Sequence, residues 1–339
     1  MQPLVSILLP IWNARAHLPA CLNSIARQSC RAYELLVVDD GSTDNSAEFV
    51  ANYARQDPRI RLWRLPHCGI VPALNVGLSL ARAPLIARMD ADDCMHDRRL
   101  ELQLECLHAD PGLVLVASRV RGFPDHQLDL GMREYLRWQN ACMSSGEIAD
   151  QRYVESPLCH PSVTFRRAPI LAAGGYRAGA FAEDYELWLR LLARGARMCK
   201  LEQVLLQWRQ SYRSLSKTDP RYRRHGFDRL RAEYLANDPR LATSRPLVIW
   251  GAGRRTRQRC QWLFARGCAI TAWIDIDPKK IGQRLNDLPV HNPGWLARQH
   301  QAKRPLVLVY VSRHGARERI AAALGAMGYL PGEDFLPVG

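Results

Sequence analysis

The sequence predicts an α/β protein in which two successive parts each form a mostly parallel sheet with flanking helices. Two observations predict this fold class. From the N-terminus, apolar runs of strand length alternate with amphipathic segments of helix length, which is the pattern of βαβ units. The same alternation starts again after a polar, arginine-rich stretch. We therefore expect a first domain at 1–210, a linker with a basic helix at 211–245, and a smaller α/β domain at 246–339.

The elements of the first part follow from periodicity. Short apolar runs predict strands, and apolar residues repeated every three or four positions predict helices. Strands are expected at 4–9, 34–38, 60–65, 84–87 and 113–116, and helices at 18–25, 43–54, 71–80 and 98–107. Further on, the pattern is less regular, with helices expected near 132–142 and at 183–192. The second of these begins with two acids, which favour a helix N-terminus.

The second part reads as a small Rossmann-like unit. Strands are expected at 246–250, 269–274 and 305–310, and a helix at 313–327. Gly251-Ala252-Gly253 follows the first strand and precedes a helix, as in dinucleotide-binding folds, and Asp275 ends the next strand, where an acid could bind a ribose. The third glycine position of that fingerprint holds Thr256. Two interpretations stay open, namely nucleotide or nucleotide-sugar binding and a structural or docking module.

Length and composition restrict the class of protein. The 339 residues, 47% of them hydrophobic, suffice for two domains with cores of their own. We find no apolar run of about 18 residues that predicts a transmembrane helix, and no basic segment followed by an apolar one at the N-terminus. The 10 cysteines are scattered without a C-x-x-C pair, which favours reduced thiols. These features predict a cytoplasmic protein.

The net charge of +14 lies entirely in the C-terminal part. Residues 209–245 hold 10 basic and 4 acidic side chains, and residues 246–339 hold 14 and 6. A positive surface can attract an anionic membrane or phosphorylated substrates, although compositional bias is an alternative; we expect no nucleic acid partner. The predicted helix at 222–235 has an apolar side (Tyr222, Phe227, Leu230, Tyr234), so it is either a membrane-surface helix or the helix that docks the second domain.

An acidic stretch, Asp90-Ala91-Asp92-Asp93, follows the predicted strand 84–87. In an extended segment Asp90 and Asp92 point the same way, and two such carboxylates repel unless a cation lies between them. Oxygen ligands of this kind suit Mg²⁺ or Mn²⁺ with substrate phosphates. The alternative is a solvated acidic turn before a helix. Asp39 and Asp40 end a neighbouring predicted strand, so one crevice could hold both groups.

Five segments resemble, in order, the motifs of family 2 glycosyltransferases. They are the opening strand 5–13, the nucleotide-binding motif 37–44, the segment 69–77, the D-x-D motif 90–93 and the E-D motif 182–190. Five motifs in the expected order over about 210 residues make a specific match. The resemblance implies a GT-A fold, a nucleotide-diphosphate sugar donor and transfer with inversion at the anomeric carbon.

The resemblance also implies roles for individual residues. Asp184 would be the general base, with Glu183 as the less favoured base or its orienting neighbour. Asp90 and Asp92, with Asp93 as a further candidate, would hold Mn²⁺ or Mg²⁺. The nucleotide-sugar site would include Pro10, Trp12, Asn13, Asp39, Asp40, Asn75, Arg88, Asp90 and His160. Structural alternatives stay open: a turn acid at Asp40, a surface arginine at Arg88, a core histidine at His160 and a helix-cap acid at Asp184.

One departure from the family pattern bears on the reaction. Processive members carry a Q-x-x-R-W signature where this chain has Gln207-Trp208-Arg209-Gln210. With no predicted membrane spans either, we infer transfer of a single sugar to a hydroxyl of a glycan or lipid-linked acceptor. The expected process is cell-surface polysaccharide biosynthesis, with peripheral attachment at the inner face of the cytoplasmic membrane.

Two other functions are kept as alternatives. The first is a catalytically degenerate nucleotide-sugar-binding or scaffold protein, against which the intact acidic residues argue. The second is a sugar nucleotidyltransferase. It would need a glycine-rich loop after the first strand, and 10–15 holds no glycine.

Overall fold

The computed structural model of the chain describes residues 2–212, 214–300, 304–311 and 315–339. The chain folds into two compact units. Unit 1 contains Met1–Ile148 and Leu158–Asp219, and unit 2 contains Ala149–Pro157 and Pro220–Gly339. Residue 213 of the predicted linker and residues 313 and 314 of the predicted helix 313–327 lie outside the described residues. Within the described ranges, no helix is long and apolar enough to cross a membrane.

Unit 1 is built on an eight-stranded sheet of order β3-β2-β1-β4-β7-β6-β8-β5. Its strands are β1 (Val5–Ile11), β2 (Tyr33–Asp40), β3 (Ile60–Leu65), β4 (Leu85–Arg88), β5 (Cys94–Met95), β6 (Leu113–Phe123), β7 (Thr164–Arg166) and β8 (Arg197–Arg209). The first four strands of this order are parallel, and β7 is antiparallel to both of its neighbours. The predicted α/β class with a mostly parallel sheet is confirmed.

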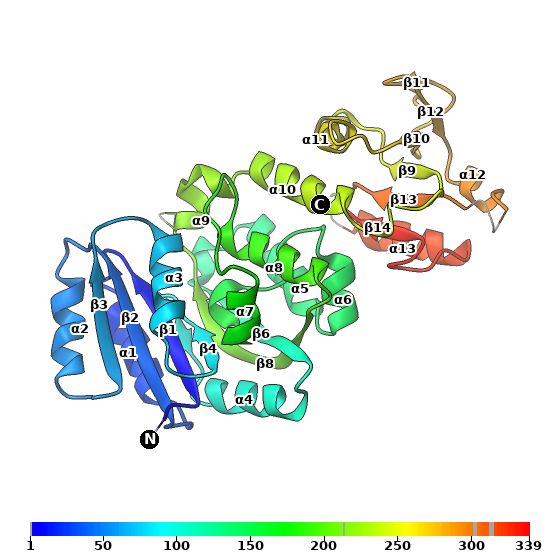
Figure 1. Ribbon diagram of the computed structural model, residues 1–339. Coiled ribbons are helices and arrows are strands. Elements are labelled where there is room, and N and C mark those ends of the chain that lie inside the picture. The colour runs from blue at the N-terminus through cyan, green and yellow to red at the C-terminus, as the bar shows by residue number, and fades with distance from the viewer. Residues whose placement is uncertain (1, 213, 301–303, 312–314) are drawn as a thin grey trace. The chain divides into compact units, whose positions relative to one another are not determined.

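Helices cover both faces of the parallel half of this sheet (Figure 1). The helices of unit 1 are α1 (Leu18–Ala26), α2 (Ser46–Ala54), α3 (Ile70–Leu80), α4 (Arg99–Ala109), α5 (Leu130–Ala141), α7 (Arg167–Ala172), α8 (Glu183–Ala193) and α9 (Leu215–Thr218), and α6 (Ser145–Gln151) begins in unit 1 and ends in unit 2. Helix α3 packs on β1 and β2. Because both faces are covered, all eight residues of β2 are buried, as expected for a parallel strand with an apolar run.

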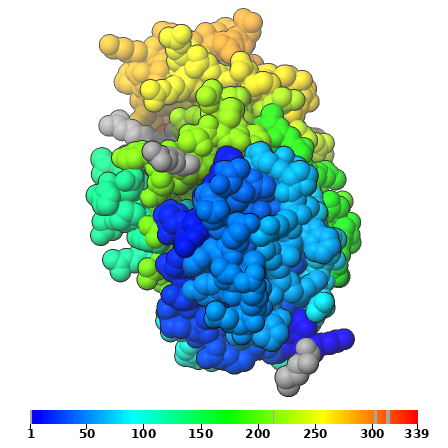
Figure 2. Space-filling model, turned by 90° about the vertical axis from the view of Figure 1, so that its left-hand side faces the viewer, coloured from blue at the N-terminus to red at the C-terminus, as the bar shows by residue number. Residues whose placement is uncertain are grey.

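The register of β1 brings the predicted acidic residues to one edge of the sheet. Ile11 at the end of β1 pairs with Asp39 of β2, and Leu8 pairs with Arg88 of β4. The segments that follow the three strands therefore leave the sheet at the same carboxyl edge. Figure 2 shows the β3 side of unit 1, where the N-terminal segments, blue to light blue, form one continuous surface.

The longest strand of unit 1, β8, was not predicted. It pairs in parallel with β6 along most of its length and antiparallel with β5, where Cys94 lies opposite Gln207. Since β5 directly follows the acidic stretch, this pairing brings the end of β8 beside Asp92 and Asp93. Strand β8 thereby adds a side of the site that the sequence pattern did not indicate.

Unit 2 contains a six-stranded sheet of order β11-β12-β10-β9-β13-β14. Its strands are β9 (Leu247–Trp250), β10 (Ile270–Ile274), β11 (Arg284–Leu285), β12 (Leu288–His291), β13 (Leu306–Val309) and β14 (Phe335–Pro337). All except β11 are parallel. The helices are α10 (Arg224–Ala236), α11 (Arg254–Phe264), α12 (Gly294–Ala297) and α13 (Ala316–Ala326). The order of the five parallel strands is that of a doubly wound sheet.

The apolar side of α10 is used inside unit 2. Leu230, Ala232 and Leu235 are buried, and α10 packs against α11. Leu230 belongs to the predicted apolar side, and the other members of that side are partly buried, namely Tyr222, Phe227 and Tyr234. Of the two interpretations of the predicted basic helix, the structure therefore supports docking within the C-terminal part, because these apolar residues are not free to enter a membrane.

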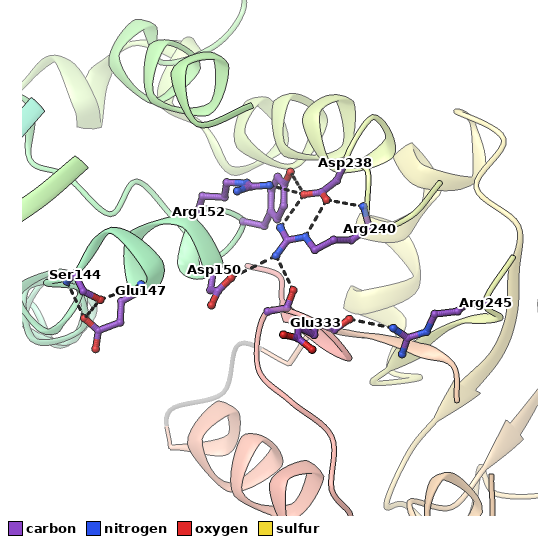
Figure 3. Close-up of polar contacts among 10 residues, drawn as sticks. Ser144, Glu147, Asp150, Arg152, Asp238, Arg240, Arg245 and Glu333 are labelled. Carbon is purple, nitrogen blue, oxygen red and sulfur yellow. Dashed lines mark hydrogen bonds and ion pairs between the residues drawn. The ribbon is translucent and has the colours of Figure 1, made fainter. Parts of the chain in front are cut away.

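Asp238 is the centre of a buried polar network in unit 2 (Figure 3). Its carboxylate accepts hydrogen bonds from the Arg240 guanidinium at 2.7 and 2.8 Å, from the Tyr153 hydroxyl at 2.8 Å, and from Arg152. Arg240 also donates to the Gly332 carbonyl at 3.0 Å. Burial alone would raise the pKa of Asp238, but the hydrogen bonds from Arg240 and the charge of Arg152 outweigh it and lower the pKa. The network ties the segment 149–157 to the rest of unit 2.

Replacing Asp238 by alanine is expected to destabilise the protein by about 2–3 kcal/mol, because two partly buried guanidinium ions lose the buried carboxylate that they share and Arg240 keeps only Asp150 as an acidic partner. The measurement is guanidinium-induced unfolding near pH 7. The matched control is Glu333→Ala, since the Glu333 side chain is exposed and Arg245 binds only its main-chain carbonyl. Equal unfolding midpoints for the two variants would contradict the assignment. Because the folded-state pKa is depressed, the stabilisation is present above the unfolded value of about 3.9 and is lost as the pH falls through the folded-state value.

Candidate active site

Three carboxylates converge where the chain leaves β4. One carboxylate oxygen each from Asp90, Asp92 and Asp93 lies within 4.8 Å of the others. Asp93 is fully buried, and its Oδ2 has no hydrogen-bond partner among the described residues. The predicted convergence of Asp90 and Asp92 is therefore observed, and Asp93 joins them.

The electrostatics of this cluster fit a divalent cation. Burial and the charge of Asp90 raise the pKa of Asp92 to about 6. Burial and the charges of Asp92 and Asp90 raise the pKa of Asp93 well above its usual value. A carboxylate oxygen left without a donor, next to two other acids, is a group that a hard cation satisfies. The cluster thus has the oxygen ligands and the uncompensated negative charge that binding of Mn²⁺ or Mg²⁺ requires.

Two arginines flank the cluster. Arg88 is only 2% exposed and forms an ion pair with Asp90, while its Nε has no hydrogen-bond partner among the described side chains and backbone. Arg209, at the end of β8, donates its main-chain N–H to Asp93 at 2.6 Å and its Nε–H to the Asp92 carbonyl at 2.8 Å. Arg88 thus lies beneath the cluster rather than on the surface. Arg209 was not predicted as a site residue, although it stands at the position of the processive family signature.

On the β2 side, the two adjacent acids differ in their bonding. Both oxygens of Asp40 are engaged, by the main-chain N–H groups of Cys68 at 2.8 Å and Gly69 at 2.9 Å and by His67 at 2.8 Å. Asp39 accepts only the Ser42 N–H, at 3.2 Å. Its second oxygen has no partner among the described residues. Asp40 therefore holds the loop 67–69 in place, whereas Asp39 has a free oxygen that can accept a hydrogen bond from a ligand.

An exposed aromatic pair lies beside these acids. Trp12 is 53% exposed, and its ring stacks on His67 with centroids 4.6 Å apart and an interplanar angle of 15°. His67 is the residue that contacts Asp40. Flat, exposed rings next to hydrogen-bond acceptors can take a planar heterocycle by stacking.

The other residues predicted for the nucleotide-sugar site join loops of the chain. Asn13, at φ 50°, accepts the Thr43 N–H at 2.8 Å and so connects the loops that follow β1 and β2. Asn75 accepts the Tyr176 N–H and donates to the Tyr176 carbonyl, both at 2.9 Å. Pro10 lies within β1 and pairs with Val38. Asn13 and Asn75 thus shape the site by holding its loops.

Asp184 is in the first turn of α8, after Glu183. Its Oδ1 accepts the Tyr185 N–H at 2.8 Å. Burial and the neighbouring Glu183 charge raise the pKa of Asp184 to about 7, against the lowering effect of Arg88. Because Arg88 is also paired with Asp90, its guanidinium lies within electrostatic reach of both the acidic cluster and Asp184. The E-D motif and the D-x-D motif therefore both lie within electrostatic range of Arg88.

His160 lies in a buried group behind these residues. Its Nε2 is 2.8 Å from the Tyr176 hydroxyl, and its ring meets Trp188 edge-on at 5.9 Å. Burial, with the charge of Arg88, keeps the pKa of His160 well below its usual value, so the ring is neutral. Tyr176 was not predicted as a site residue, because its link to Asn75 joins positions 101 residues apart.

The motif Gly251-Ala252-Gly253 in unit 2 is bound by another residue of unit 2. The Asp275 carboxylate accepts the Ala252 N–H at 2.8 Å and the Asp277 N–H at 2.9 Å, and Lys280 lies 3.2 Å away. Asp275, the candidate acid for a ribose, therefore already binds three donors of the protein itself.

The fold and the site together define a class, the GT-A type of nucleotide-sugar transferase. Two solved structures share the fold. TarS of S. aureus in complex with UDP-GlcNAc has a TM-score of 0.56 at 17% identity, with 69% of this chain and 66% of that chain covered. The mannosyltransferase PcManGT of Pyrobaculum calidifontis, in complex with GDP-Man and Mn²⁺, has a TM-score of 0.50 at 21% identity over 70% and 63%.

Sequence comparison identifies the family. The profile of "Glycosyl transferase family 2" matches residues 6–172. The amylovoran biosynthesis glycosyltransferase AmsE of Erwinia amylovora is 28% identical over 249 residues, 73% of this chain and 89% of the relative. EpsE of Bacillus subtilis, named a glycosyltransferase, is 30% identical over 61% of this chain and 73% of its own. UDP-Gal:alpha-D-GlcNAc-diphosphoundecaprenol beta-1,3-galactosyltransferase of Escherichia coli is 28% identical over 62% and 75%. The chain belongs to glycosyltransferase family 2.

Proposed function

We propose that the protein transfers one sugar from a nucleotide-diphosphate donor to a hydroxyl of a glycan or lipid-linked acceptor, with inversion and with a divalent cation. The observation that carries the proposal is the placement of buried Arg88 within reach of both the acidic cluster and Asp184. One site then offers ligands for a metal–diphosphate and, separately, a carboxylate suited to proton transfer.

The cation belongs at the acidic cluster. Asp92 and Asp93 would hold it, with Asp90 directed by its ion pair with Arg88. When bound, Mn²⁺ or Mg²⁺ neutralises the charge that builds on the leaving nucleoside diphosphate. Arg209 orients Asp93 through its main-chain N–H and keeps a guanidinium beside Asp92. The cation identity is supported by analogy with the PcManGT complex, which contains Mn²⁺.

The nucleotide belongs at the β2 side of the site. The stacked rings of Trp12 and His67 would cover the base, and the free oxygen of Asp39 would accept a hydrogen bond from it. Asp40 would act indirectly, because its carboxylate holds the loop that carries His67. The resemblance had assigned the hydrogen bond with the base to Asp40, with Asp39 as a second acceptor, and this proposal exchanges the two roles.

The proton chemistry belongs to Asp184. Its carboxylate takes the proton of the acceptor hydroxyl as that oxygen bonds to the anomeric carbon and the bond from that carbon to the diphosphate oxygen breaks. Attack from the face opposite the leaving group inverts the anomeric configuration. A carboxyl with a pKa near 7 suits a base that works near neutral pH. Glu183 supports this role by keeping that pKa raised.

The acceptor class and the location are proposed by analogy. One relative is named for a diphosphoundecaprenol-linked acceptor, and another for biosynthesis of the polysaccharide amylovoran. A lipid-linked acceptor would place the enzyme at the inner face of the cytoplasmic membrane, bound peripherally.

A ligand panel tests this function. Thermal unfolding of the wild type would be followed with nucleoside diphosphates and nucleotide sugars of each base, with Mn²⁺ and with a chelator, because a ligand of the native state raises the apparent stability. We expect one base to stabilise the protein, and only with the cation present. A Trp12→Ala variant, which lacks the stacking ring, should lose that shift. No stabilisation by any nucleotide with Mn²⁺ would count against the proposal.

A further inference from the structure

Two cysteines of unit 1 meet where α4 packs against β8 (Figure 1). The sulfurs of Cys106 and Cys199 lie 3.7 Å apart. Cys106 is in the last turn of α4, and Cys199 is near the start of β8. A disulfide bond is about 2.05 Å long. The two thiols are therefore in contact but not bonded, and side-chain movements of less than about 2 Å would bring their sulfurs to bonding distance.

The surroundings keep the two thiols together. Both side chains are partly buried and pack against a small apolar cluster of Leu107, Leu113 and Val116. Close to the cysteines, the Arg197 guanidinium pairs with the Asp110 carboxylate, which is a second link between the end of α4 and the start of β8. Because the folded chain holds the thiols side by side, a bond between them is favoured over bonds to other molecules.

We propose that Cys106 and Cys199 form a modification site, at which a small-molecule disulfide oxidises the pair to a reversible intramolecular disulfide. The Cys106 thiolate attacks one sulfur of the reagent, forms a mixed disulfide and releases one thiolate of the reagent. The Cys199 thiolate then attacks the Cys106 sulfur, and the second half of the reagent leaves as a thiolate. The protein loses two protons and two electrons, and the reagent gains them as two thiols.

The order of the two attacks follows from the environment of Cys199. Burial raises the pKa of the Cys199 thiol to about 12, and the charge of the Cys106 thiolate adds to this effect. Cys199 therefore stays protonated at first, and Cys106 is the thiol that attacks the reagent. Once Cys106 is part of the mixed disulfide, its charge no longer opposes the ionisation of Cys199, which can then complete the bond.

The disulfide would stabilise the part of unit 1 that carries the candidate active site. It joins positions 93 residues apart, and the enclosed chain includes the E-D motif. A cross-link between distant positions stabilises a protein mainly by restricting the unfolded chain. Cys199 lies near the start of β8, whereas Arg209, which contacts the acidic cluster, lies at its end. We therefore expect the link to raise stability without changing turnover.

The test compares the reduced full-length protein with the protein oxidised by the disulfide of 2-mercaptoethanol. Mass spectrometry of peptides from oxidised wild type should find Cys106 linked to Cys199, and a reductant should reverse the link. Oxidation should raise the midpoint of thermal unfolding by about 5 °C or more.

Variants test the order of attack. Cys199→Ser should accumulate the mixed disulfide at Cys106, whereas Cys106→Ser should leave Cys199 unmodified. Neither variant should gain stability on oxidation. Each protein is compared with its own reduced form, so any effect of the serine on folding cancels. The matched control is the double variant Cys30→Ser with Cys268→Ser. It also lacks two partly buried thiols, and it should still form the link and gain stability.

Turnover is measured as donor cleavage with Mn²⁺. The reagent also reaches the exposed Cys68, so oxidised wild type is compared with oxidised Cys106→Ser, in which Cys68 reacts equally. The two rates should be the same, and a slower rate in wild type alone would contradict a purely stabilising link. Absence of cleavage from every form would count against the proposed function and not against this site.

Three further outcomes overturn the proposal. In the first, the linked peptides are absent from wild type although Cys68 has reacted with the reagent. In the second, the oxidised and reduced forms of wild type unfold at the same temperature. In the third, the disulfide joins two molecules, which a non-reducing gel would show as a dimer.

Discussion

Replacing Asp184 by asparagine is expected to lower kcat by about 10³-fold, with the donor KM changed by less than about threefold. The amide has the shape of the carboxylate and can still accept the Tyr185 N–H, but it cannot take a proton. The measurement is steady-state release of nucleoside diphosphate in the presence of acceptor. Glu183→Gln is the discriminating control, because it removes the neighbouring charge and keeps the proposed base.

The pH dependence of kcat/KM in the wild-type enzyme tests the role of Asp184 independently. The base must be ionised, so kcat/KM should fall about tenfold per pH unit below a pKa near 7. The Glu183 charge raises this pKa and Arg88 lowers it. Glu183→Gln should therefore move the acid limb to lower pH. An acid limb that stays in place in Glu183→Gln, or a larger loss of kcat there than in Asp184→Asn, would contradict the assignment.

The second large effect is expected at Asp92. Asp92→Ala should reduce metal-dependent turnover by about 10³-fold, which corresponds to about 4 kcal/mol of charge stabilisation. Calorimetric titration with Mn²⁺ and the nucleotide should show weakened binding of both. Asp93→Asn tests the third acid, since the amide can still accept the Arg209 N–H while the buried oxygen that lacks a partner is lost.

Asp97→Asn is the matched control for the acidic cluster. Asp97 lies four residues after Asp93, is about half exposed and pairs with Arg27, so this variant should bind Mn²⁺ like wild type. If Asp92→Ala and Asp97→Asn bound Mn²⁺ equally, the cluster would not be the metal site.

Local patterns predicted the part of the fold that parallel strands build. A strand covered on both faces contains a continuous apolar run, as β1 does at 7–9 and β2 at 35–38, and strands of this kind stand out in the sequence. The same holds for α8, whose apolar residues recur at helical spacing after two acids. Because the carboxyl ends of parallel strands share an edge, the placement of Asp39 and Asp90 at the same edge of the sheet also followed from the predicted topology.

Other features depend on contacts between distant positions and carry no local signal. Strand β8 mixes charged and apolar residues, and its pairing with β6 shifts register, so neither strand nor helix periodicity is clear. Its end carries Arg209, which completes the acidic cluster. The binding of Asn75 to Tyr176 is likewise visible only in the folded chain. The assignment of residues 149–157 to unit 2 is also visible only in the folded chain, because Arg152 and Tyr153 of this segment bind Asp238.

The difference between Asp39 and Asp40 shows a further limit. In the sequence the two acids are adjacent, and the family resemblance favoured Asp40 as the acceptor for the base. In the structure, Asp40 is engaged by loop 67–69 and only Asp39 retains a free oxygen. The sequence identified the motif, and the folded loops decide which of its carboxylates is available.

The most direct test of a metal-dependent transfer with Asp184 as base compares donor binding with donor cleavage in the same proteins. After chelation, wild type should neither bind nor cleave the nucleotide sugar, and Mn²⁺ should restore both activities. Asp184→Asn with Mn²⁺ should bind the donor as wild type does and cleave it about 10³-fold more slowly. Cleavage by wild type in the presence of the chelator, or cleavage by Asp184→Asn at the wild-type rate, would contradict the account.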